Sequence, residues 1–111
     1  MQLIWMWESF KDKFYLKFLN PYGIQPFGYC PVQANGHLAT GEFYYFRARH
    51  ARWQLDICES GKAWWDGEIL YTRGGTYGEN FDAGYMPVHE VIKRVNQVIK
   101  QYETKRSQIR G

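Results

Sequence analysis

The sequence predicts an α+β fold, in which an antiparallel sheet of three to five strands packs against a C-terminal amphipathic helix. Three observations lead to this prediction. Two turns within residues 30–57 give strand registers that agree with each other, an apolar stripe recurs at helical spacing in residues 87–105, and a second such stripe lies in residues 3–19. With 111 residues, 45% of them hydrophobic and 23% charged, the chain is expected to form a single domain over residues 1–111.

The N-terminal residues 3–19 place large apolar side chains at steps of four, three, four and four, which is helical spacing. The sequence from Asn20 to Gly23 then provides a stop and a turn. A short strand is the alternative, because residues 14, 16 and 18 are also apolar in alternation. We expect a helix whose stripe consists of Leu3, Trp7, Phe10, Phe14 and Phe18.

The stretch 30–57 predicts a three-stranded antiparallel meander. Ala39-Thr40-Gly41 fits a three-residue hairpin loop with glycine in the left-handed position, and His50-Ala51 fits a second turn. Because side chains alternate along a strand, each turn independently decides which residues share a face. Both turns predict the same set facing the helix, namely Tyr44, Phe46, Ala48, Trp53, Leu55 and Ile57.

The remaining elements follow from turn signals and periodicity. Residues 63–72 predict a further hairpin with Asp66-Gly67 at its tip. Residues 73–86 hold four glycines and no periodicity, which predicts a Gly-rich loop. Pro87 suits a first helical turn, the helix is expected to run over 87–105, and residues 106–111 are expected to form a basic tail.

Composition excludes several classes of protein. The formal net charge of +3 is no larger than that of residues 100–111 alone, which argues against broad binding to a phosphate backbone. The two cysteines, Cys30 and Cys58, provide neither a disulfide framework nor a metal site. No run approaches the roughly 18 consecutive apolar residues of a membrane span. We therefore expect a cytoplasmic protein without a membrane partner.

The face of the meander that points away from the helix carries the candidate binding residues. Aromatic side chains alternate there with arginines, and rings and guanidinium groups dominate the energetics of many protein interfaces. A tryptophan in the expected second hairpin and a tyrosine in the Gly-rich loop could extend this surface. The candidates are Phe43, Tyr45, Arg47, Arg49, Arg52, Trp64 and Tyr77. The alternatives are a solvated face with Arg47 near Asp56, or a face covered by the N-terminal helix.

No pattern of catalytic residues stands out. His89-Glu90 opens like a zinc-binding helix, but Lys93 occupies the position of the second histidine, and His89 is expected to be an exposed first-turn residue. A nucleophilic pair of Cys58 with His37 lacks a local feature that would lower the pKa of the thiol. We therefore expect no enzyme activity, no cofactor and no metal.

These observations favour a small non-catalytic module that binds a protein partner or a second copy of itself. Such a chain would suit an accessory or inhibitor protein, including one of viral origin. The alternative is a protein that binds single-stranded nucleic acid through the same face and the basic tail, because aromatic rings interleaved with arginines can stack bases and neutralise phosphates.

Overall fold

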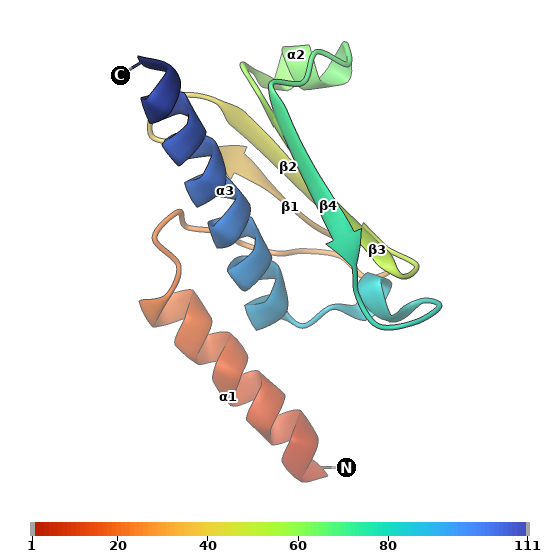
Figure 1. Cartoon of the computed structure of the whole chain (residues 1–111). Helices are drawn as coiled ribbons and strands as arrows, with labels where there is room; N and C mark the ends of the chain where they lie inside the picture. The colour runs from red at the N-terminus through yellow and green to blue at the C-terminus, as the bar shows by residue number, and fades with distance from the viewer. Residues whose placement is uncertain (1, 111) are drawn as a thin grey trace.

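The computed structural model describes residues 2–110, with side chains described for residues 10–108, and confirms the α+β arrangement. A four-stranded antiparallel sheet in the order β1-β2-β3-β4 carries a long C-terminal helix on one face, and an N-terminal helix lies beyond that helix (Figure 1). The strands are β1 (Val32–His37), β2 (Phe43–Arg49), β3 (Arg52–Cys58) and β4 (Tyr71–Thr76).

The predicted meander is confirmed residue by residue. Ala34 pairs with Phe46 across the first hairpin, and Phe46 pairs with Leu55 across the second. Gly41 adopts a positive φ of 102° at the end of the first loop, as a three-residue hairpin requires. His50 takes a φ of 59° in the second turn. The face that the two turns predicted to be buried is therefore the face that meets the C-terminal helix.

The core lies between the sheet and helix α3 (Val88–Arg110). Apolar side chains recur every three or four residues along α3, so that one face of the helix is buried while the lysines face water. The buried apolar residues of this helix are Val91, Ile92, Val95, Val98, Ile99 and Tyr102. The helix continues through Arg110, so residues 106–110, which were predicted to be a tail, extend α3 instead.

The hairpin predicted over residues 63–72 is wrong. The chain forms a short helix, α2 (Gly61–Trp65), and only then enters β4, which pairs with β3. Ser60 starts this helix by accepting a hydrogen bond from the backbone N–H of Ala63 at 3.0 Å. Gly67, with a φ of 79°, ends it in a left-handed conformation, and the N–H of Glu68 returns to the carbonyl of Ala63. Asp-Gly is thus part of a helix C-terminus here, not a hairpin tip.

The stretch predicted to be a single Gly-rich loop also contains regular structure. Residues 73–76 belong to β4, and a 3₁₀ helix, η1 (Asp82–Tyr85), precedes α3. A hydrogen bond connects η1 to the turn between β2 and β3, because the N–H of Ala83 donates to the carbonyl of His50 at 2.7 Å. The described part of this stretch is therefore folded against the second hairpin.

Helix α1 (Gln2–Phe18) confirms the predicted N-terminal helix, although the side chains of Leu3 and Trp7 lie outside the described residues. Its polar side meets the start of α3. Asp12 accepts hydrogen bonds from the backbone N–H of His89 at 2.9 Å and lies 2.7 Å from the Nδ1 of that residue. His89 is consequently buried, not exposed as the sequence predicted. Among the described residues, no helix is both long and apolar enough to cross a membrane.

A polar cluster joins the first hairpin to the C-terminal part of α3. The carboxylate of Glu42 accepts hydrogen bonds from the hydroxyl groups of Thr40 and Tyr102 and from the guanidinium of Arg106. Burial by itself would raise the pKa of Glu42, but the bonds from Thr40 and Tyr102 and the positive charge of Arg106 lower it to about 2. The carboxylate is therefore held ionised at one end of the core.

Candidate binding groove on the outer face of the sheet

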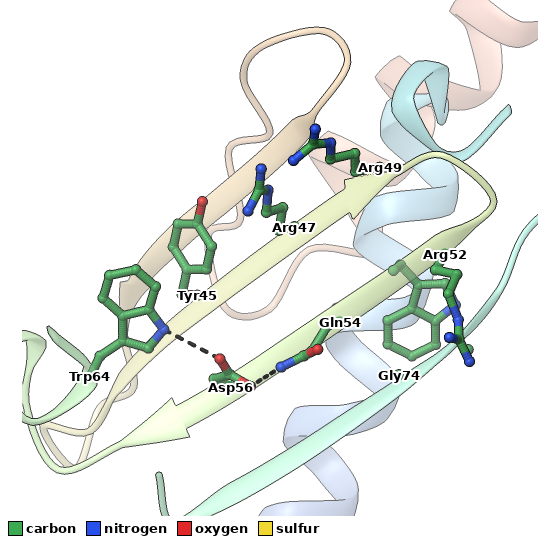
Figure 2. A pocket seen from close by; sticks show the side chains of 10 residues that line it. Tyr45, Arg47, Arg49, Arg52, Gln54, Asp56, Trp64 and Gly74 are labelled. Atoms are coloured by element: carbon green, nitrogen blue, oxygen red, sulfur yellow. Dashed lines mark hydrogen bonds between the residues drawn. The ribbon is translucent and has the colours of Figure 1, made fainter. Parts of the chain in front are cut away.

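The face of the sheet opposite α3 forms an open groove of about 540 Å³, which we call the outer groove. The rings of Tyr45 and Trp64 lie at one end of the groove, and Arg47, Arg49 and Arg52 lie toward the other, with Gln54 and Asp56 between them (Figure 2). The floor comes from β3, and the side along β4 carries glycine. The lining residues are Tyr45, Arg47, Arg49, Arg52, Trp53, Gln54, Asp56, Trp64, Gly74 and Gly75.

The aromatic end is a packed cluster. The short helix α2 lies over the ends of β2 and β3 and brings Trp64 to within 4.7 Å of the Tyr45 ring, measured between centroids. The ring of Phe43 lies 6.3 Å from that of Trp64, and the ring of His37 lies 5.6 Å from that of Phe43, both measured between centroids. The hydroxyl of Tyr45 donates to the side-chain carbonyl of Gln33. These rings are therefore held by one another and by fixed polar partners.

Asp56 anchors this arrangement from the floor of the groove. Its carboxylate accepts hydrogen bonds from the indole of Trp64 at 3.3 Å, the amide of Gln54 at 2.9 Å and the hydroxyl of Thr72 at 2.8 Å. All three donors are neutral, and Asp56 is 7% exposed. Asp56 forms no ion pair with Arg47, which was one of the alternatives. Its carboxylate oxygens accept from these three neutral groups instead.

The arginine end has no such partners. Arg47, Arg49 and Arg52 are all exposed, and within the described residues none of them forms an ion pair or a side-chain hydrogen bond. Arg49 and Arg52 are also direct cross-strand neighbours. Like charges opposite each other destabilise a sheet. The end of the groove next to the second turn thus concentrates positive charge that the described residues do not neutralise.

Five of the seven predicted binding residues line the outer groove, and these are Tyr45, Arg47, Arg49, Arg52 and Trp64. Phe43 borders the groove through its contact with Trp64. Tyr77 does not belong to it. The ring of Tyr77 packs on the core side, where the guanidinium of Arg94 lies 4.9 Å from its centroid.

Sequence reasoning missed several features of the groove. With residues 61–65 helical, Trp65 is the tryptophan that projects into solvent, at 81% exposure, whereas Trp64 is half-buried. The open side along β4 does not follow from the predicted Gly-rich loop, because Gly74 and Gly75 belong to β4. Their pairing with Gln54 and Trp53 shows that they are strand residues, and they bring no side chain to that side of the groove. The polar floor could be predicted from the sequence, because Gln54 and Asp56 alternate along β3 with the core residues and therefore face the groove.

The structure also locates the groups considered for catalysis. Cys58 is buried, and burial together with the negative charge of Asp56 raises the pKa of its thiol, which is the opposite of what a nucleophile requires. Cys30 is exposed, and both thiols are free. Among the residues described, no three of His, Cys, Asp or Glu come together as metal ligands.

Comparison with known proteins finds no matching family model, no matching curated protein and no matching solved structure. The geometry of the outer groove is therefore the basis for any functional interpretation.

Proposed function

We propose that this chain is a non-catalytic binding module whose outer groove takes an acidic segment of a protein partner. The observation that carries the proposal is the arginine end, where Arg47, Arg49 and Arg52 form no ion pair with a carboxylate of the described residues. Arg49 and Arg52 lie opposite each other on neighbouring strands, and their like charges repel. An anionic group bound between them would remove this repulsion. Carboxylates of a bound segment would do so in bidentate geometry.

The aromatic rings at the other end of the groove are a second reason to expect a protein ligand. Trp64 and Tyr45 form a rigid, half-buried wall with Trp65 exposed beside it, at 6.3 Å between the tryptophan rings. Tryptophan, tyrosine and arginine are the residues that contribute most at protein interfaces, and pre-packed rings lose little entropy on binding. An acidic segment with an apolar residue near its acidic run would fill both ends of the groove. Binding of this kind is how an accessory or inhibitor protein would act.

Single-stranded nucleic acid, the alternative, fits the aromatic end less well. Proteins that bind single strands present ring faces on which successive bases stack. Here Tyr45 and Trp64 pack against each other at 4.7 Å, and Trp64 is held further by Asp56. A base could not enter between them without breaking these contacts. The arginine end alone would attract a phosphate backbone, so the two ligands must be separated by experiment.

The test uses fluorescence anisotropy with two labelled probes, a glutamate-rich peptide containing one leucine and an oligothymidylate. We expect the peptide to bind, and we expect Arg47→Ala and Arg52→Ala each to weaken it by about tenfold, which is the loss of roughly 1.4 kcal/mol of charge-assisted hydrogen bonding. Arg73→Ala is the matched control, because Arg73 is an exposed arginine of β4 that lies outside the groove.

Two outcomes would contradict the proposal. The first is tight binding of oligothymidylate with a steep dependence on salt, together with no binding of the peptide, which would favour the nucleic-acid alternative. The second is peptide binding that Arg73→Ala weakens as much as Arg47→Ala does, because this would place the ligand elsewhere on the surface.

A further inference from the structure

Over residues 10–18, helix α1 turns its phenylalanine side chains away from the rest of the protein. Asp12 and Tyr15 face α3, where they contact His89, and the carbonyl of Leu19 just beyond the helix accepts a hydrogen bond from Asn96 at 2.8 Å. At 3.6 residues per turn, positions two residues away from Asp12 lie on the opposite side of the helix. Phe14 is one such position, so the described part of the apolar stripe, Phe10, Phe14 and Phe18, points outward. Figure 1 shows no other element on that side of α1.

The outward side of the described part of α1 exposes three phenylalanine rings. Phe10 is 64% exposed, Phe14 is 46% exposed and Phe18 is 63% exposed. The rings of Phe14 and Phe18 lie 5.2 Å apart, which makes them one continuous apolar surface. Contiguous exposed apolar surface on a small protein marks an interaction site more often than a chance arrangement. Such a stripe requires an apolar surface to receive it.

The charges beside the stripe indicate what kind of surface this is. Lys13 and Lys17 are exposed on the same helix, and the ammonium of Lys17 lies 5.5 Å from the centroid of the Phe18 ring. Lys100 of α3 borders the same end of α1 as Lys17 and Phe18. The acidic Asp12, by contrast, is turned inward against His89. Around the outward stripe, the exposed charges of the described residues are therefore cationic.

We propose that α1 docks in the plane of an anionic lipid surface, with Phe14 and Phe18 inserted at the boundary between headgroups and acyl chains and Lys13 and Lys17 at the level of the headgroups. An interfacial helix of this type combines aromatic residues on one face with lysines at its margin. It needs no span-length apolar run, so the expectation of no membrane partner, which followed from the lack of such a run, does not apply to it. The lysine stems pass along the apolar surface while their ammonium groups reach the anionic headgroups.

A second copy of the chain is a less suitable occupant, because of charge. In a two-fold dimer formed through α1, each copy would use the same surface. Both contributing surfaces would then be cationic, with no exposed carboxylate among the described residues of that surface to neutralise Lys13 and Lys17. An anionic lipid surface provides the missing negative charge. This inference does not depend on the outer groove, which lies on the other side of the sheet from α3.

The test is cosedimentation of the full chain with two kinds of vesicle, one of phosphatidylcholine alone and one in which a third of the lipid is phosphatidylglycerol. We expect partitioning onto the phosphatidylglycerol vesicles at low salt. Replacing Phe14 and Phe18 by alanine should weaken it by about tenfold for each ring removed. The double substitution Lys13→Glu and Lys17→Glu should weaken it by more than about tenfold.

The controls are matched for residue type and exposure. Phe81→Ala removes a ring that is 59% exposed on the segment before η1, and Lys62→Glu reverses an exposed lysine of α2. Both should bind vesicles as the unmodified chain does. Far-UV circular dichroism of every variant establishes that α1 and the domain remain folded, so that a loss of binding reports on the surface alone.

Four results would overturn the inference. The unmodified chain could remain in the supernatant with both kinds of vesicle. It could bind both kinds equally, which would remove the role of the anionic headgroup. The alanine variant at Phe14 and Phe18 could bind as well as the unmodified chain. Finally, analytical ultracentrifugation could reveal a dimer that the same alanine variant abolishes, with no vesicle binding, which would assign the stripe to a second copy of the chain.

Discussion

The arginine end of the outer groove makes a prediction about stability that needs no knowledge of the partner. Arg49 and Arg52 are directly opposite each other on β2 and β3, and both side chains are exposed without a carboxylate partner among the described residues. We predict that Arg49→Glu stabilises the protein, because it converts a repulsive cross-strand pair into an attractive one.

The magnitude follows from the pair itself. Cross-strand charge pairs contribute about 0.5 kcal/mol each, unfavourable for like charges and favourable for opposite ones. Replacing one by the other should therefore raise the free energy of unfolding by about 1 kcal/mol, which corresponds to a rise in Tm of about 4 °C for a domain of this size. Arg49→Gln removes the charge without adding an attraction, so it should give about half of this gain. Arg49→Lys keeps the charge and should change little.

The assay is urea unfolding followed by circular dichroism, at low salt and at about 1 M salt, where the Debye length falls to roughly 3 Å. The gain for Arg49→Glu should be largest at low salt and should shrink at high salt. The same variant should bind the glutamate-rich peptide more weakly, because it places a carboxylate in the groove. The predicted repulsion is refuted if Arg49→Glu is no more stable than the unmodified chain at low salt, or if its gain in stability does not depend on salt. Either result would mean that Arg49 and Arg52 do not repel each other measurably.

Three further predictions concern the buried polar groups. Because the pKa of Glu42 is lowered to about 2 in the folded protein, from an ordinary value of 4.5, its carboxylate contributes about 3 kcal/mol above pH 4.5 that is lost as the pH falls toward 2. Urea unfolding over this pH range should show the loss, and a Glu42→Gln variant that keeps the same pH dependence would contradict it. Asp56→Ala leaves the indole of Trp64 without its acceptor and should lower the free energy of unfolding by about 2 kcal/mol; an unchanged thermal unfolding curve would show that water replaces the carboxylate at no cost. In the native protein a soluble thiol reagent should modify Cys30 rapidly and Cys58 only after unfolding. Cys58 is buried and the pKa of its thiol is raised, so little reactive thiolate is accessible. Modification of Cys58 as fast as that of Cys30 would contradict this.

The strand registers could be predicted because two independent turns constrain the same strand. The loop ending at Gly41 and the turn at His50 each decide which face Phe46 occupies, and they agree. A shift of one residue at either turn would have moved every side chain of one strand to the other face. The outward positions of Tyr45, Arg47, Arg49 and Arg52 follow from this parity alone.

The region after β3 could not be predicted, because its signals are ambiguous without tertiary context. Asp66-Gly67 is a frequent hairpin tip, yet the same left-handed glycine also ends helices. Ser60, three residues before Ala63, is the local signal for a helix start, because its hydroxyl accepts from the N–H of Ala63. In the helix that forms instead, Trp65 is exposed and the indole of Trp64 donates to Asp56.

The placement of Tyr77 and of helix α1 depends on long-range contacts. The ring of Tyr77 turns toward α3, where Arg94 covers it, and no local pattern distinguishes this from a ring that faces the outer groove. Helix α1 has a clear apolar stripe, and a stripe is ordinarily the side of a helix that is buried. Here the polar contact between Asp12 and His89 sets the orientation instead. Periodicity identified the helix but not the surface against which it packs.

Binding of an acidic protein segment in the outer groove is tested most directly by a two-dimensional NMR titration of the backbone and indole N–H groups with the glutamate-rich peptide. We predict that the largest changes in chemical shift occur at Arg47, Arg49 and Arg52 and at the indole of Trp64, with the exposed face of α3 unaffected. Changes concentrated on the basic C-terminal turns of α3, or an absence of change at the three arginines at saturating peptide, would contradict the proposed role of the groove.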